Sequence, residues 1–193
     1  MALSVAVYCG SRFGDRPAYT QSAQTLGRLI AASGGCVVYG GGRVGLMGAV
    51  ADAAIAAGGR VVGVIPQALM DREVGHAGLS ELHVVQTMHE RKQLMAERAD
   101  AFIALPGGIG TLEEIYEVWS WQQLGYHDKP VALLNVEGYY DALLEFMRVS
   151  FERGFVSAPQ YHALLVDDDP MRLLARLGEA AAKATARDDY SRI

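Results

Sequence analysis

Lysine is scarce in this chain of 193 residues, which carries it only at positions 92, 129 and 183. A pyridoxal-phosphate enzyme needs a lysine in its pocket to hold the cofactor as a Schiff base. Lys183 falls in the last expected helix and Lys129 precedes Pro130 in an expected loop, while nothing near Lys92 marks a partner for the pyridine nitrogen. The composition therefore argues against pyridoxal chemistry.

Cysteine is also scarce, because Cys9 and Cys36 are the only two and both fall in or beside expected strands. Buried free thiols in a reducing compartment are the expected state of such residues. The five histidines are scattered, and no group of cysteines and histidines has the spacing of a metal-ligand set. We expect neither a metal nor a cofactor.

The chain lacks long apolar runs and an excess of basic residues. Its formal net charge is −5, which argues against broad nucleic-acid binding. The apolar runs are too short and too often interrupted to span a membrane, and the first residues do not resemble a signal peptide. With 51% hydrophobic and 20% charged residues, the composition is typical of a globular protein, and we expect a cytoplasmic one.

What the sequence does contain is a regular alternation of short apolar β-rich runs with helical patterns. Segment 67–80 is expected to be a long loop, and 188–193 a flexible tail. This order predicts a single α/β domain over residues 1–193, with a mostly parallel sheet flanked by helices. The expected strands are 5–8, 36–39, 60–65, 82–85, 101–105, 131–134 and 164–166; the expected helices are 18–32, 46–57, 88–99, 115–124, 139–153 and one that begins at 170.

A glycine-rich junction follows the expected strand 101–105, with Gly107, Gly108, Gly110 and Thr111 ahead of a helical pattern. Glycine lets the backbone turn sharply and present its N–H groups at close range. The N-terminus of a helix adds partial positive charge, and the two together make a phosphate site. A tight turn capped by Thr111 is the alternative, but the glycines, the hydroxyl and the acidic pair that follows favour a site.

A second glycine-rich junction, with Gly40, Gly42 and Gly45, fits the pattern G-x-G-x-x-G. A dinucleotide site also needs an acidic residue about 20 positions later to hold a ribose. The expected strand 60–65 instead ends at Pro66 without an acid at its tip, so we reject NAD. A general nucleotide or phosphate role and the close packing of a helix on the sheet remain equal alternatives.

Two charged residues fall on the apolar sides of their expected helices. Around the helix axis Glu114 lies among apolar residues, whereas Glu113 lies in the polar sector, and Arg91 lies between apolar residues of the helix 88–99. A charge in such a place is costly unless it has a partner or a task. For Arg91 the alternative is a packed stem with its head in solvent. For Glu114 the alternative is a glutamate stabilised by the helix dipole, which explains Glu113 well and Glu114 poorly. We therefore favour a site for Glu114, and also for Arg91, because Arg91 begins its helix at the carboxyl end of a strand.

Residues 106–114 read PGGIGTLEE, residues 88–92 read MHERK, and residues 39–48 form a glycine-rich loop. These stretches match, in this order, the motif PGGxGTxxE, the second motif and the N-terminal glycine loop of the LONELY GUY (LOG) family, and the chain thus resembles these cytokinin riboside 5′-monophosphate phosphoribohydrolases. The similarity runs from about Val5 to Val156. Members are often labelled "lysine decarboxylase", and the scarcity of lysine independently disfavours that label.

The resemblance implies a Rossmann-like fold and hydrolysis of the N-glycosidic bond of a nucleoside 5′-monophosphate, which yields free base and ribose 5-phosphate. It implies that Arg91 and Glu114 are catalytic. A non-catalytic carrier of a nucleotide or phosphorylated cofactor on the same fold is the alternative. The substrate-binding positions predicted from the resemblance are Ser11, Gly42, Glu73, Met88, Lys92, Gly108, Ile109, Gly110, Thr111 and Glu113.

The helix that follows the first glycine junction is apolar over a wide arc, with Trp119 and Trp121 in different parts of it. Such an arc is buried either against a second subunit or within the chain, beneath residues 137–155. We expect the first, in a symmetric homodimer, and the family resemblance agrees.

Overall fold

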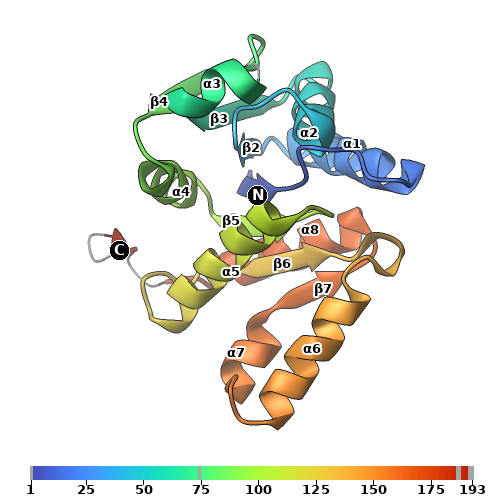
Figure 1. The fold of residues 1–193 in the computed structure, drawn as a ribbon, viewed down its shortest axis with the longest axis vertical. Helices are drawn as coiled ribbons and strands as arrows, with labels where there is room; N and C mark the ends of the chain where they lie inside the picture. The colour runs from blue at the N-terminus through green and yellow to red at the C-terminus, as the bar shows by residue number, and fades with distance from the viewer. Residues whose placement is uncertain (1, 74, 186–187, 191–193) are drawn as a thin grey trace.

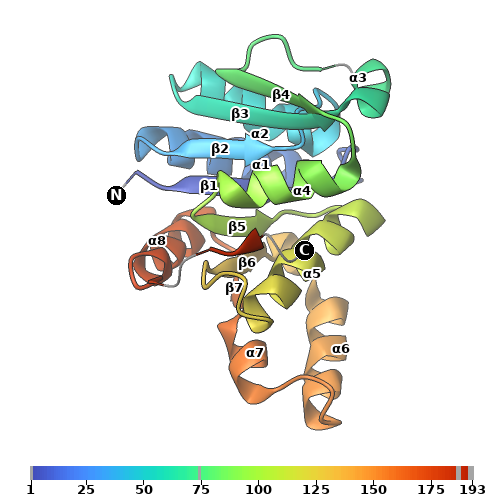
Figure 2. The same ribbon diagram turned by 90° about the vertical axis from the view of Figure 1, so that its left-hand side faces the viewer.

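A parallel sheet of seven strands forms the centre of the protein in the computed structural model, which describes residues 2–73, 75–185 and 188–190. The six strand pairings among the described residues are all parallel (Figure 1). They give the order β4-β3-β2-β1-β5-β6-β7, which runs from top to bottom in Figure 2. The central strands are buried along most of their length, as parallel strands covered on both faces must be. The strands are β1 (Ser4–Tyr8), β2 (Cys36–Tyr39), β3 (Arg60–Pro66), β4 (Glu81–Val85), β5 (Ala101–Ala104), β6 (Val131–Leu134) and β7 (Leu165–Asp167).

Helices connect the strands, and several begin at residues that suit a helix start. Pro17 stands at the first position of its helix, and Thr87 and Asp169 each accept a hydrogen bond from a first-turn N–H group. The helices are α1 (Pro17–Ala32), α2 (Gly45–Ala56), α3 (Gln67–Glu73), α4 (Met88–Glu97), α5 (Ile109–Gln123), the short 3₁₀ helix η1 (Val136–Gly138), α6 (Asp141–Glu152), α7 (Ala158–Ala163) and α8 (Pro170–Ala181).

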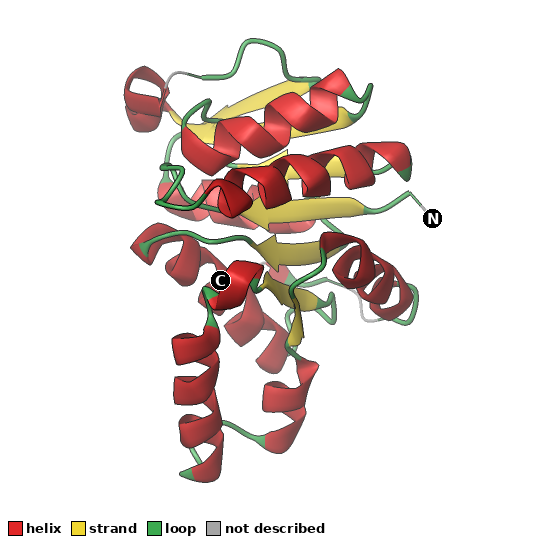
Figure 3. Cartoon of the chain, turned by 90° about the vertical axis from the view of Figure 1, so that its right-hand side faces the viewer, coloured by secondary structure: helices red, strands yellow, loops and turns green. Residues whose placement is uncertain are grey.

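The helices cover the sheet in two layers, each with its own apolar cluster. Helices α4 and α5 lie on one face (Figure 2), and α1 and α2 lie on the other (Figure 3). Helix α8 joins the second layer through Leu173 and Leu177, and α6 with α7 extends the first layer beyond the β7 edge. This three-layer α/β arrangement is a Rossmann-like fold.

Successive strands are added to the sheet in one direction from β1 to β4 and in the opposite direction from β5 onward, so the winding reverses between β1 and β5. The chain winds outward from β1 to β4 and then returns to add β5 on the other side of β1. In open parallel sheets, ligands bind beyond the carboxyl ends of the strands at such a point. The loops after β1 and β5 therefore define where a site is expected.

The structure differs from the sequence-based expectation in four places. The expected loop 67–80 begins with helix α3, and α7 was not expected. Helix α5 begins at Ile109, so half of the first glycine junction is its opening turn. Tyr190 of the expected flexible tail is buried against Trp121, and Asp188 pairs with Lys129 at 2.6 Å. Residues 188–190 are therefore packed, whereas 191–193 lie outside the described residues.

Candidate active site

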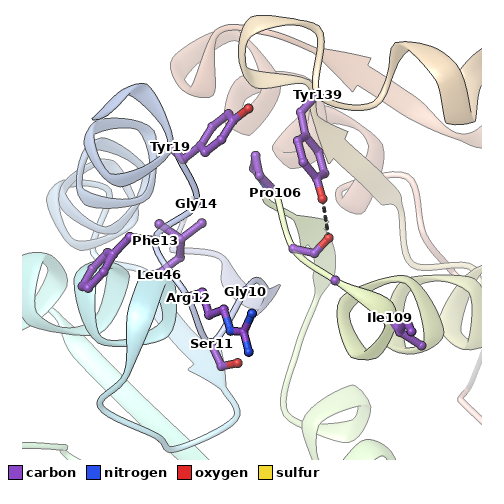
Figure 4. A pocket seen from close by; sticks show the side chains of 12 residues that line it. Gly10, Ser11, Arg12, Phe13, Gly14, Tyr19, Leu46, Pro106, Ile109 and Tyr139 are labelled. Carbon is purple, nitrogen blue, oxygen red and sulfur yellow. Dashed lines mark hydrogen bonds between the residues drawn. The ribbon is translucent and has the colours of Figure 1, made fainter. Parts of the chain in front are cut away.

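Two adjoining cavities lie where the loops after β1 and β5 meet. The inner cavity has a volume of about 230 Å³, and the outer chamber has one of about 580 Å³. The two share Gly10, Ser11, Gly108 and Ile109 and so form one connected cleft. The inner cavity is otherwise lined by Cys9, Met47, Arg91, Gly110, Thr111 and Glu114, and the outer chamber by Arg12, Phe13, Gly14, Tyr19, Leu46, Pro106, Gly107 and Tyr139 (Figure 4).

The first turn of α5 borders both cavities. Gly108 is its N-cap residue and offers no side chain to the N–H groups of the turn, which are left for a ligand. A Cβ atom at Gly108 or Gly110 would meet nothing within 4 Å, so both backbones face open space. A Cβ at Gly107 would instead lie 2.1 Å from Thr111 Oγ1 and 2.8 Å from the Gly10 nitrogen. Glycine at 107 is therefore needed where the two loops touch, and the exposed turn can receive an anion.

Arg91 and Glu114 meet at the inner cavity from different helices. The Arg91 Nη2 atom lies 3.6 Å from Glu114 Oε1, and the two side chains are only 8% and 11% exposed. Arg91 comes from the first turn of α4, and Glu114 lies one turn beyond the start of α5. The low exposure means that each charge needs the other, as expected for a charged pair on otherwise apolar helix faces.

The guanidinium of Arg91 lies directly against the second glycine junction. A Cβ atom at Gly40 would come within 2.0 Å of Arg91 Nη2. The Arg91 Nη1 atom contacts Met88 Sδ at 3.8 Å, whereas the buried Nε atom has no hydrogen-bond partner among the described residues. Buried donors are nearly always satisfied, so this N–H indicates a place for a substrate or water oxygen. The glycine at position 40 thus makes room for a site side chain.

Lys92, the neighbour of Arg91, forms a separate cluster between α4 and α5. Its Nζ atom lies 2.6 Å from Glu113 Oε1 and 2.8 Å from Glu117 Oε1. Burial opposes the positive charge of Lys92, but the hydrogen bonds to the two glutamates outweigh it and raise its pKa above the ordinary value. A Schiff base forms from the neutral amine, so this environment also disfavours pyridoxal chemistry at Lys92.

The structure gathers seven of the predicted site residues around the inner cavity: Ser11, Arg91, Gly108, Ile109, Gly110, Thr111 and Glu114. Four others lie outside its lining. Lys92 and Glu113 bind each other, Met88 supports Arg91, and Gly42 pairs its backbone with Gly75. Glu73 ends α3, but its side chain lies outside the described residues.

Several lining residues were not singled out from the sequence. Cys9 and Gly10 directly follow β1, and their only signal in the sequence is this position at the end of an expected strand. Burial, followed by the nearby charge of Glu114, raises the pKa of the Cys9 thiol far above its ordinary value. Cys9 is therefore a neutral wall of the cavity and not a nucleophile. Tyr19 and Tyr139 of the outer chamber carried no sequence signal.

The wide apolar arc of α5 is covered by the chain itself. Trp119 is 4% exposed and donates its indole N–H to the Gln160 carbonyl at 3.3 Å, while Trp121 is 6% exposed and lies against Tyr190. The argument from this arc to a second subunit is therefore wrong, because α7 and residues 188–190 bury the tryptophans within one chain.

Comparison with known proteins gives the same family as the motifs. The family model described as "Possible lysine decarboxylase" matches residues 47–177. The "Probable cytokinin riboside 5'-monophosphate phosphoribohydrolase LOG4" of Oryza sativa subsp. japonica is 48% identical over 179 residues, which cover 93% of this chain and 78% of that protein. The "Cytokinin riboside 5'-monophosphate phosphoribohydrolase LOG1" of Arabidopsis thaliana is 46% identical over 173 residues, 90% of this chain and 81% of that protein.

Solved structures agree on the fold. The molybdenum cofactor carrier protein of Chlamydomonas reinhardtii superposes with a TM-score of 0.72 at 22% identity, over 95% of this chain and 100% of that one. At this identity the likeness concerns the fold alone. The family match and the identity to curated relatives together show that the chain belongs to the LONELY GUY (LOG) family.

Proposed function

We propose that this protein hydrolyses the N-glycosidic bond of cytokinin riboside 5′-monophosphates and of AMP, and releases free base and ribose 5-phosphate. The names of relatives at 46–48% identity support this reaction. The observation that carries it is the Arg91–Glu114 contact of 3.6 Å in a cavity that also holds the uncapped start of α5. One wall of the cleft thus suits an anion, and another carries the negative charge that a ribosyl cation needs.

The 5′-phosphate would bind at the first turn of α5. Free N–H groups and the helix dipole favour a dianion there, and Thr111 of the same turn lines the inner cavity. Fixing the phosphate holds the ribose at a defined distance from Glu114, one turn along the helix. Binding energy from the phosphate then positions the bond that breaks.

Glu114 would act on the ribose. As the bond between C1′ and the base nitrogen breaks, its electron pair leaves with the base, and positive charge develops on the ribosyl ring. The Glu114 carboxylate stabilises that charge and orients a water molecule, whose oxygen bonds to C1′. One water proton remains as the new hydroxyl and the other leaves to the departing base. The Glu114 side chain is only 11% exposed, so bulk water screens it little.

Arg91 would keep Glu114 ionised in its buried place and use its remaining donors on the substrate. Its Nε atom, which has no hydrogen-bond partner among the residues that the structure describes, is available for this. A carrier protein on the same fold would need the α5 turn but no buried Arg–Glu pair, so the pair favours catalysis. The test is incubation of the purified protein with AMP and with isopentenyl-AMP, followed by detection of free base. Tight binding of both without release of base would support the carrier.

We further propose a cytoplasmic homodimer. Exposed apolar side chains in the α6–α7 region support association, because Phe146 is 63% and Phe155 is 86% exposed. No helix in the described parts of the chain is long and apolar enough to cross a membrane. Light scattering at micromolar concentration tests the assembly, and a mass of one chain would contradict it.

A further inference from the structure

Three consecutive carbonyl groups before α5 each accept a hydrogen bond from another part of the chain. The Leu105 carbonyl accepts from the Tyr140 hydroxyl at 2.6 Å, and the Pro106 carbonyl accepts from the Gly10 N–H at 3.0 Å. The Gly107 carbonyl accepts from the Tyr139 hydroxyl at 2.6 Å (Figure 4). The carbonyl groups of residues 105–107 are therefore all held by hydrogen bonds immediately before the first turn of α5, where the phosphate is proposed to bind.

The bond from Tyr139 has a consequence for the turn itself. A peptide unit is planar and trans, so its C=O and N–H groups point in opposite directions. When Tyr139 holds the Gly107 carbonyl, the Gly108 N–H must point away from Tyr139, and Gly108 borders both cavities. The bond from Tyr140 does not set an N–H direction, because the nitrogen that follows Leu105 belongs to Pro106 and carries no hydrogen.

The glycines around this peptide unit cannot hold the direction themselves. Gly107 is bounded by its contacts with Thr111 and Gly10, but Gly108 has open space at its Cβ position. Glycine has the largest conformational freedom of all residues, and a carbonyl turned toward the bound anion would repel it. The Tyr139 hydroxyl is therefore the restraint that favours the binding conformation.

Tyr139 is itself held by a strained segment. Glu137 has a φ of 49°, in the left-handed region that non-glycine residues adopt at a cost, and the following Gly138 has a φ of 72°. The Glu137 carboxylate pairs with Arg16 at 2.9 Å, at the start of α1. The Tyr139 ring lies edge-on to Tyr19 and Tyr140, with centroids 5.6 and 4.9 Å away. These contacts fix the phenol over the Gly107 carbonyl.

We propose that Tyr139 is a positioning residue for the 5′-phosphate, which acts by orienting the Gly107–Gly108 peptide unit. This inference rests on the proposed function and names a residue that contributes to the selectivity of the site for a phosphorylated ligand. Tyr140, its neighbour, has a purely structural bond to the same connection.

The test compares Tyr139→Phe with Tyr140→Phe, and uses Tyr161→Phe on α7 as the matched control. One neutral hydrogen bond contributes about 0.5–1.5 kcal/mol, so Tyr139→Phe should weaken ribose 5-phosphate binding about three- to tenfold in calorimetry. KM for AMP should rise by a similar factor with kcat little changed, while adenosine affinity stays the same. The melting temperature should hardly move, because Tyr139 is 41% exposed and water can replace its bond.

Tyr140→Phe should have the opposite pattern, with a loss of stability and no loss of affinity. Its hydroxyl is buried, so its loss should lower the melting temperature by roughly 3–8 °C and leave the ribose 5-phosphate affinity of the folded protein unchanged. An unchanged affinity in Tyr139→Phe, or an equal loss for adenosine, would overturn the inference. Absence of base release by the wild type would instead refute the proposed function, and ribose 5-phosphate binding would still test Tyr139.

Discussion

Replacing Glu114 by glutamine keeps the shape of the side chain and removes its charge. Two unit charges about 4 Å apart interact by about 4 kcal/mol at an effective dielectric constant near 20. The ribosyl ring carries only part of a unit charge in the transition state, so a loss of roughly 2.7 kcal/mol is reasonable. That corresponds to about a hundredfold in kcat. AMP affinity should survive, because the first turn of α5 is untouched.

The same change also leaves Arg91 without its charged partner. The Arg91 side chain is 8% exposed, and breaking a buried pair can cost about 3 kcal/mol of stability. Urea denaturation must therefore accompany the assay, so that turnover is given per folded molecule. In the double variant Arg91→Met with Glu114→Gln, no charge remains unpaired. We expect this variant to regain stability while activity stays low.

Base release is measured for each purified variant, alongside AMP binding by calorimetry. Glu179→Gln on the exposed face of α8 is the matched control and should be silent. Glu113→Gln should also lose little, because Lys92 keeps Glu117 as a partner. Turnover within threefold of wild type in Glu114→Gln would refute the reasoning, and so would a defect of equal size in Glu113→Gln.

Three further results are expected. AMP should exceed adenosine in kcat/KM by at least about a hundredfold, since only AMP carries the phosphate that orders the ribose; similar values would contradict the phosphate site. Gly40→Ala should fold normally but lose turnover at least tenfold, because its methyl group takes the place of Arg91 Nη2; an active variant would show that the guanidinium can move. Burial lowers the pKa of His127 from 6.5 to about 4. The folded state thus favours the neutral ring. This preference contributes about 3 kcal/mol to the free energy of unfolding above pH 6.5, and the contribution is lost as the pH falls from 6.5 to 4. Urea denaturation at several pH values should show a flatter profile in His127→Gln.

The alternation of strands and helices could be predicted from the sequence because buried parallel strands and amphipathic helices leave distinct patterns. Helix α3 could not, because its seven residues make too few turns to show an apolar periodicity. The sequence predicts the start of this helix at residue 115, whereas α5 begins at Ile109. Glycine is unfavourable inside helices, so the glycines at 108 and 110 conceal the first turn. Here the need for free N–H groups outweighs local preference.

Helix phase places Arg91 and Glu114 each on an apolar helix face, where a charge needs a partner or a task. The family resemblance names the two as one catalytic pair, and the structure brings them within 3.6 Å of each other. Phase also separated Glu113, which the structure turns toward Lys92. Helix phase cannot show what covers an apolar face. The tryptophans of α5 therefore suggest a second subunit, whereas in the structure Tyr190 and α7 cover them. Tyr139 left no signal at all, because its role depends on contact between the connections that follow β5 and β6, which are 32 residues apart in the sequence.

The contact between Gly40 and Arg91 ties two distant sequence positions to one another. The space that a side chain at position 40 would need is filled by the far end of a side chain on α4. Among relatives of this chain, the two positions should therefore co-vary: where the arginine is replaced by a shorter residue, alanine or serine becomes acceptable at 40. A glycine in this pattern is usually interpreted as a nucleotide contact. At position 40, glycine is instead required by the arginine side chain that occupies the neighbouring space.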